Sequence, residues 1–135
     1  MNIMLIDGQG GQLGGQIIKS LKANFTDINI SAVGTNATAT ATMLKAGAAQ
    51  AATGENPVLV ACKKADIIIG PIGIVIADAL LGEITPKMAV TIGQADATRI
   101  LLPVNKCDNL VAGVPDLNMS TIINDVIQKI KVNLA

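Results

Sequence analysis

The amino-acid sequence predicts an α/β fold in which residues 1–135 form a single domain around a doubly wound, mostly parallel, Rossmann-like sheet with the strand order 3-2-1-4-5-6. Short apolar runs, typical of strands buried on both faces, alternate with stretches whose apolar residues recur at helical spacing. Half of the residues are hydrophobic and only 15% are charged, which is enough apolar material for one core and excludes a disordered chain. A chain of 135 residues also has the length of one ordinary domain.

The first half of the chain alternates between strands and helices. The expected elements are a strand at 2–6, a helix at 11–24, a strand at 28–33, a helix at 37–46 and an edge strand at 48–52. The first strand is short, apolar and followed at once by glycine, as a buried parallel strand should be. In the first helix, Leu13, Ile17 and Leu21 recur every four residues and therefore share one face. Gly47 is a natural end for the second helix.

The second half repeats this alternation. The expected elements are a helix beginning at Asn56 and Pro57, a strand at 66–69, a helix beginning at Thr85 and Pro86, strands at 99–104 and 109–114, and a last helix capped by Asn118. In the pairs Asn56-Pro57 and Thr85-Pro86, the side-chain oxygen of the first residue is expected to cap the helix. The proline then stands in the first turn, where its missing N–H costs no hydrogen bond. The last helix is amphipathic, with the apolar residues Ile122, Ile123, Val126, Ile127 and Ile130.

Residue types that the chain lacks limit its chemistry. The absence of histidine removes the commonest general base and zinc ligand. The absence of tyrosine excludes the Tyr/Lys mechanism of short-chain reductases that have a similar glycine spacing. A formal net charge of zero and a single aromatic residue, Phe25, argue against a nucleic-acid partner. Cys62 and Cys107 form no metal-spaced pair, so no metal site is expected.

The chain is expected to be a soluble, cytoplasmic protein. Two isolated cysteines fit a reducing compartment. The N-terminus lacks the basic and long apolar regions of a signal peptide. Residues 67–81 come nearest to membrane-spanning length, but Gly70, Pro71, Gly73 and Asp78 interrupt them, so no membrane partner is expected.

A glycine-rich loop follows the first strand and leads into the first helix. Gly8, Gly11 and Gly14 fit the spacing G-x-x-G-x-x-G, whereas Leu13 breaks the related pattern G-x-G-x-x-G. Glycines in this context let the backbone approach a phosphate, and the helix N-terminus offers free N–H groups to the anion. The predicted binding loop consists of Asp7, Gly8, Gln9, Gly10, Gly11, Gln12, Leu13 and Gly14. The alternative is a tight turn that binds nothing.

Two further segments are expected beside this loop. With strands one and four adjacent, ligands should bind where the strand order reverses. Strand four leads there into Gly70, Pro71, Ile72 and Gly73, which otherwise form only a rigid turn. Strand two leads into Thr35 and Asn36, which are uncharged, whereas an NAD site usually has Asp or Glu there and an NADP site uses Arg nearby. The neutral residues weaken the dinucleotide interpretation, so the ligand stays open between NAD, NADP, a mononucleotide and another small phosphorylated molecule. Asn36 has the alternative role of a helix cap.

Three acidic residues and one thiol need separate interpretation. Asp7 would repel a phosphate unless Mg²⁺ bridges them, or its carboxylate accepts a ribose hydroxyl or loop N–H bonds. Its alternative role is to fix its own loop. Glu55 and Glu83 precede helices, where carboxylates suit the helix dipole, although both have the option of facing the binding site. Cys107, beside Lys106, is the alternative nucleophile.

The chain also resembles a known family. The segments IDGQGG, GTN, MLKAGA, TGENP, DIIIGPIGI, LGEITPKMA and ILLPVNKC are similar to those of short bacterial proteins described only as a domain of unknown function. The resemblance extends from Ile6 to Cys107 and into the last expected strand, with a departure at Gln12 and Leu13, where the family has Gly-Ile-like pairs. It implies a Rossmann-like fold and no particular activity.

Three functions follow as expectations. The first is a cytoplasmic protein that binds a nucleotide or dinucleotide through the loop from Gly8 to Gly14. The second is an enzyme that uses Asp7 or Cys107 with a bound nucleotide or metal. The third is a non-catalytic regulatory or scaffold protein whose glycine turns are structural. A homodimer is expected, because so apolar a short chain should leave hydrophobic surface to bury.

Overall fold

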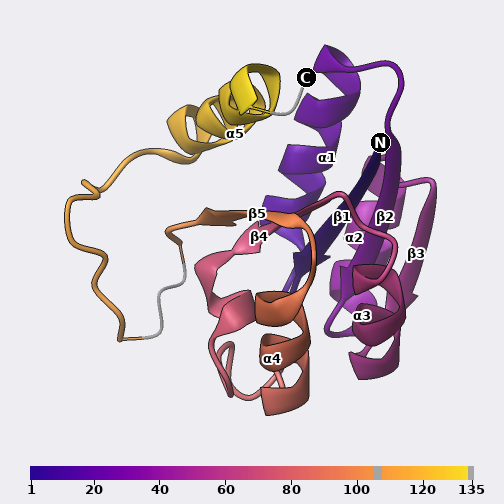
Figure 1. The fold of residues 1–135 in the computed structure, drawn as a ribbon, viewed down its shortest axis with the longest axis vertical. Helices are drawn as coiled ribbons and strands as arrows, with labels where there is room; N and C mark the ends of the chain where they lie inside the picture. Colours follow the sequence, from indigo (N-terminus) through magenta and orange to yellow (C-terminus); the bar gives the residue numbers. More distant parts are fainter. Residues whose placement is uncertain (105–107, 134–135) are drawn as a thin grey trace.

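Five parallel strands form one sheet in the order β3-β2-β1-β4-β5, which confirms the predicted α/β class and the first five strands of the predicted order. The computed structural model describes residues 1–104 and 108–133 (Figure 1). The elements are β1 (Asn2–Asp7), α1 (Gln12–Asn24), β2 (Asn29–Gly34), α2 (Ala37–Ala46), β3 (Gln50–Thr53), α3 (Glu55–Cys62), β4 (Ile67–Pro71), the 3₁₀ helix η1 (Ile72–Val75), α4 (Pro86–Gln94), β5 (Thr98–Leu102) and α5 (Met119–Asn133).

Side chains that alternate along β1 divide the core in two. Ile3 and Leu5 join a cluster with apolar residues of α1 and α5. Met4 and Ile6 join a second cluster with residues of α3, η1 and α4. Because successive side chains of a strand point to opposite faces, the two clusters lie on opposite faces of the sheet. β1 is thus buried on both sides, as its unbroken apolar sequence predicts.

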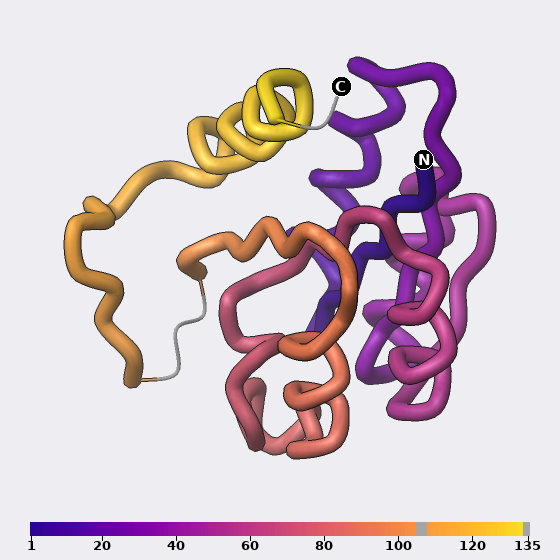
Figure 2. The backbone as a smooth tube through the Cα atoms, viewed as in Figure 1, coloured from indigo at the N-terminus to yellow at the C-terminus, as the bar shows by residue number. Residues whose placement is uncertain are grey.

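The predicted sixth strand at 109–114 is wrong. Residues 108–118 contain no strand and are almost entirely exposed. Figure 2 shows this segment as an open arc outside the body of the molecule. A further parallel strand beside β5 would need a crossover of about 10–12 residues, which is longer than the connection 103–108. The connection is therefore too short for 109–114 to pair in parallel with the free edge of β5.

Helix starts differ in how well the sequence predicts them. Thr85 caps α4 as expected, because its Oγ1 accepts a hydrogen bond from Met88 N at 3.1 Å and Pro86 follows it. The predicted start of α3 at Asn56 and Pro57 is wrong. This helix begins at Glu55, because Gly54 has a φ of 104° and turns the chain directly from β3 into the helix.

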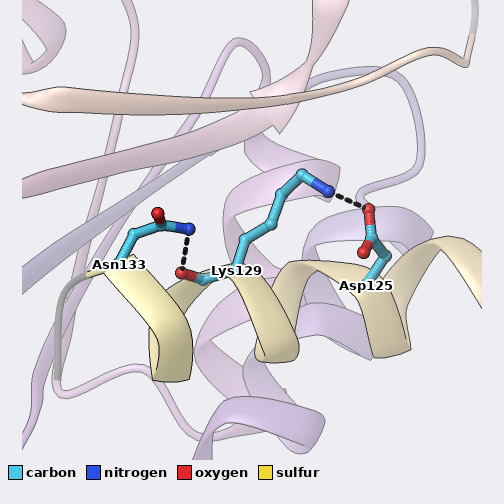
Figure 3. Close-up of polar contacts among 3 residues, drawn as sticks. All are labelled: Asp125, Lys129 and Asn133. Atoms are coloured by element: carbon cyan, nitrogen blue, oxygen red, sulfur yellow. Dashed lines mark hydrogen bonds and ion pairs between the residues drawn. The ribbon is translucent and has the colours of Figure 1, made fainter.

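The last helix returns the chain to the body of the molecule. The Oδ1 of Asn118 accepts a hydrogen bond from Thr121 N at 2.8 Å, as expected of its cap. The apolar face of α5 joins the core cluster of α1, and Figure 1 shows the two helices side by side. On its polar face Lys129 pairs with Asp125 and its carbonyl accepts a bond from Asn133 (Figure 3). No helix in the described part of the chain is long and apolar enough to cross a membrane.

Candidate functional site

The predicted site lies where the strand order reverses, between the carboxyl ends of β1 and β4 (Figure 1). We call this place the switch point. Four segments lie at the switch point or contact one another next to it. They are the loop 8–11 after β1, Thr35 and Asn36 after β2, η1 after β4, and the turn 78–83 before α4. Parallel strands bring their following loops to one edge of the sheet, so segments distant in sequence meet here.

Two glycines of the loop approach other parts of the protein. A Cβ added at Gly8 would lie 2.6 Å from Thr35 Oγ1 and 2.9 Å from Glu83 Oε1. Gly11 has a φ of 73°, and a Cβ there would lie 2.7 Å from backbone atoms of Ala39 in α2. Both positions need glycine because protein atoms occupy the space that a side chain would fill.

The other glycines of the loop differ from each other. A Cβ at Gly14 would lie 2.6 Å from Met43 Sδ, so this residue lets α1 pack against α2. At Gly10 the nearest atom is Gln12 Cγ, 3.9 Å away, and the residue is exposed. Gly10 is therefore the glycine of this loop that has open space beside it for another molecule.

Asp7 fixes the loop from within. It is 4% exposed, its Oδ1 accepts a hydrogen bond from Gly8 N at 2.8 Å, and its Oδ2 accepts one from Gly14 N at 2.7 Å. Burial raises the pKa of this carboxyl, the bonds from Gly14 and Gly8 oppose the rise, and the charge of Glu83 adds to it. Both oxygens thus bond to the loop, which is the structural role expected as an alternative for this residue.

The start of α1 keeps two free donors. Asp7 takes the N–H of Gly14, and Gly15 N bonds to Gly11 O at 2.9 Å. The N–H groups of Gln12 and Leu13 have no acceptor among the described residues. First-turn N–H groups carry the positive end of the helix dipole and suit an anion. These two donors follow Gly10 in sequence; Gln12 is exposed like Gly10, whereas Leu13 is buried.

Glu83 joins three segments at this edge. Its Oε1 accepts hydrogen bonds from Gln9 N at 3.1 Å, from Asn36 Nδ2 at 2.9 Å and from the hydroxyl of Thr35. Burial alone would raise the pKa of Glu83, but these three hydrogen bonds outweigh it and hold the pKa below its ordinary value. The carboxylate therefore ties the turn before α4 to the loops that follow β1 and β2.

An unusual turn positions Glu83. Asp78, Leu80 and Leu81 have φ values of 65°, 58° and 56°, and Gly82 follows with 85°. Leu80 is buried, whereas Leu81 is 98% exposed. Left-handed leucines cost roughly 1–2 kcal/mol each. Local strain of this kind persists where the surrounding structure holds it, and it is commonest at functional sites.

Thr35 and Asn36 occupy their predicted place. The Oδ1 of Asn36 accepts a hydrogen bond from Ala39 N at 2.9 Å, so Asn36 caps α2. Its Nδ2 donates to Gln9 O at 2.9 Å as well as to Glu83. Asn36 therefore fills its alternative role as a cap and also contacts the glycine loop.

Residues 70–73 contribute less than expected from two facing glycine turns. Gly70 and Pro71 are the last residues of β4, and Ile72 and Gly73 begin η1. A Cβ at Gly70 would lie 2.5 Å from Ile6 O, so glycine here allows β4 to lie close to β1. Gly70, Pro71 and Gly73 are buried. Their packing supports the interpretation of this segment as a rigid turn.

Sequence reasoning did not include Glu83 among the site residues. Its place before a helix assigns it to the helix dipole, with the option of facing the site. The available signal was its place after β4, because loops on that side of the sheet meet at the switch point. Its bonding partners Gln9, Thr35 and Asn36 are far from it in sequence, and no local pattern identifies such contacts.

Cys62 is buried in α3, and burial raises the pKa of its thiol, so the reactive thiolate is disfavoured. Cys107, the predicted alternative nucleophile, lies outside the described residues. Within residues 1–104 and 108–133, no three acidic or thiol side chains are grouped as metal ligands.

A groove of about 440 Å³ lies elsewhere, along α3 and the neighbouring strands. Several polar groups that line it bond to each other. Asn2 Nδ2 donates to Lys64 O at 3.2 Å, and Gln50 Nε2 donates to Ser31 Oγ at 2.8 Å. The groove contains none of the predicted site residues, so it does not belong to the switch point.

Comparison with known proteins adds a family but no activity. A family model described as a domain of unknown function (DUF3842) matches residues 2–135. No curated protein matches the chain.

Proposed function

We propose that this chain, which belongs to the family described as a domain of unknown function (DUF3842), is a Rossmann-like protein that binds a nucleotide or dinucleotide at the switch point. One observation carries the proposal. The N–H groups of Gln12 and Leu13 are unpartnered among the described residues, at the start of α1 and beside the open position of Gly10. NAD, NADP and mononucleotides all present a phosphate that these donors suit.

The strand order supports the location. The order 3-2-1-4-5 agrees with the doubly wound nucleotide-binding sheets, in which ligands lie outside the carboxyl ends of the strands at the reversal point. The phosphate would bind between Gly10 and Leu13. Gly8, Gly11 and Gly14 would support the loop without contacting the phosphate, because protein atoms fill the space beside them. The binding segment is thus shorter than the loop that the sequence predicts.

Thermal-shift measurements with NAD, NADP, ATP, GTP and FMN test this proposal. A ligand that binds only the folded state stabilises it by about 2.7 kcal/mol at 100 times its Kd, so at least one of these compounds should raise the melting temperature. Gly10→Val should abolish the rise while leaving the free protein folded, because the side chain enters open space. Gly93→Val is the matched control, since Gly93 in α4 is also open. Absence of any rise in the wild type would contradict the proposal.

The second candidate is a non-catalytic scaffold. It is favoured by the contacts of Gly8, Gly11, Gly14 and Gly70, all of which accommodate protein atoms. This candidate predicts that no phosphorylated compound stabilises the protein. An enzyme using Asp7 has less support, because both oxygens of this carboxylate already bond to the loop.

We also propose that the protein acts in the cytoplasm as a homodimer. Large apolar side chains are exposed on the segment 108–118, namely Leu110, Val114 and Leu117, with Leu110 being 95% exposed. Exposed apolar groups that lie on one segment are suited to bury against a second copy.

A further inference from the structure

We infer that Glu83 is a specificity-determining residue that accepts a hydrogen bond from a ribose hydroxyl, and that the site prefers nucleotides whose ribose has free 2′ and 3′ hydroxyls. This inference rests on the proposed nucleotide site. It excludes nucleotides with a 2′-phosphate, because the Glu83 carboxylate would repel a 2′-phosphate such as that of NADP.

The hydrogen bonds of the carboxylate leave one oxygen available. All three protein donors, from Gln9, Thr35 and Asn36, bond to Oε1. Oε2 accepts no hydrogen bond from the described residues. The side chain is also partly exposed. One oxygen therefore holds the carboxylate in place while the other keeps its capacity to accept.

Glu83 supplies a group that the sequence lacks at the usual position. NAD-binding sheets place an acidic residue after the second strand, where it bonds the ribose hydroxyls. Here that place is held by Thr35 and Asn36, which are neutral. Both donate hydrogen bonds to Glu83, so a carboxylate lies at this position although it comes from the turn before α4.

The place of Glu83 agrees with the phosphate position. Gln9 N donates to Glu83, and the next residue is Gly10, beside which we place the phosphate. In a nucleotide the ribose ring is joined to its 5′ phosphorus by only one methylene and one ester oxygen. A phosphate at Gly10 and Leu13 thus brings the ribose to the neighbourhood of Gln9 and Glu83.

Two more observations agree with this role. Glu83, whose pKa lies below its ordinary value of 4.5, is an anion at neutral pH, as an acceptor of hydroxyl groups should be. The left-handed residues Leu80 and Leu81 are strained, although Leu81 gains almost no burial from its position. The strain is consistent with a turn that is kept for the position of Glu83.

Calorimetric titration of the full chain with two ligand pairs tests the inference. The pairs are NAD with NADP, and ATP with 2′-deoxy-ATP. The wild type should bind the first member of each pair more tightly. Glu83→Gln keeps an oxygen for the three protein donors and replaces the free oxygen by an amide. This variant should weaken NAD binding roughly 10- to 100-fold, which is the range for a hydrogen bond to a charged group, and should remove the preference within both pairs.

Asp125→Asn is the matched control for loss of one negative charge, because Asp125 lies on the polar face of α5 (Figure 3). It should leave both preferences unchanged. If the wild type binds nucleotides but shows no preference, or if Glu83→Gln keeps the preference, then Glu83 only ties the loops together and this inference fails alone. If the wild type binds none of the four compounds, the inference fails, and the proposed function fails with it when GTP and FMN also leave the melting temperature unchanged.

Discussion

Gly10 and Gly11 are adjacent in sequence, but only Gly10 has space for a side chain. Gly11→Ala should lower the free energy of unfolding by about 2–5 kcal/mol, since a left-handed non-glycine residue costs roughly 1–2 kcal/mol and overpacking roughly 1–3 kcal/mol. Its Cβ would lie 2.7 Å from the backbone of Ala39. Gly10→Ala should change the stability by less than about 0.5 kcal/mol. Urea unfolding of the two variants measures both values, and equal losses would contradict the assigned packing.

Glu83 should make stability depend on pH in a defined direction. Its pKa is lower in the folded state than the ordinary value of 4.5, so its stabilising contribution is present above the unfolded-state pKa and is lost as the pH falls through the folded-state pKa. The stability difference between wild type and Glu83→Gln should therefore be largest near neutral pH and shrink in acid. Urea unfolding across the acid range measures this difference.

The contribution of Asp7 to the stability changes with pH in the opposite direction. Its pKa is raised in the folded state, so its contribution is present below the unfolded-state pKa and is lost as the pH rises through the folded-state pKa. Asp7 is present in both proteins, and its contribution cancels to first order in the comparison with Glu83→Gln. A difference that grows toward acid pH would show that the hydrogen bonds to Glu83 do not favour its ionised form.

The residues of the site were predictable to different degrees. The loop after β1 could be found from the sequence, because a strand, a glycine run and a helix follow each other locally. Its structural role and its proposed binding role could not be separated, because only the contacts of Gly8 and Gly11 with distant segments show which glycines accommodate protein atoms. The position of Glu83 depends on a turn in which two leucines are left-handed. Leucine rarely adopts this conformation, so the sequence does not indicate the turn.

The turn before α4 makes a prediction at the scale of the element. Leu81→Gly should raise the free energy of unfolding by about 0.5–1 kcal/mol, since glycine removes the cost of the left-handed conformation and loses part of the gain to its own backbone entropy. Leu81 is 98% exposed, so almost no packing is lost. Leu80→Gly is the control and should be destabilising, because Leu80 is buried. Thermal unfolding distinguishes the two variants. A Leu81→Gly variant that is less stable than the wild type would contradict the strain assigned to Leu81.

Elements with strong local signals were predicted well. β1 and β4 have unbroken apolar sequences, and Thr85 with Pro86 marks α4 correctly. The strand expected at 109–114 does not form, because an apolar pattern does not show whether a segment can pair with the sheet edge that precedes it. The prediction of the start of α3 was wrong because Gly54, with its positive φ, takes the place of the side-chain cap expected at Asn56.

For the whole molecule, the proposed homodimer predicts a particle with twice the mass of one chain. Size-exclusion chromatography with light scattering measures this mass. Leu110→Ser together with Leu117→Ser should shift the protein toward the monomer, because both side chains are exposed on the segment 108–118. Val132→Ser on α5 is the control, since this residue is also exposed but lies outside that segment. A wild-type monomer at all concentrations would contradict the dimer.

The glycine-rich loop thus combines two functions in the proposed molecule. Gly11 and Gly14 let the start of α1 lie close to α2, and Gly8 lets the loop approach Thr35 and Glu83. Asp7 fixes the loop through two N–H bonds. Gly10 and the first N–H groups of α1 remain for the ligand. The structural and binding interpretations of this sequence therefore apply to different residues of the same loop.

Amide chemical shifts during a titration with NAD test the central claim most directly. In ¹⁵N-labelled protein, the account predicts that the signals of Gly10, Gln12 and Leu13 shift as NAD is added, because their N–H groups lie at the proposed phosphate position. Signals from residues lining the groove along α3, such as Asn56, should stay in place. Shifts confined to that groove, or no shifts at the start of α1 on saturation with NAD, would contradict the account.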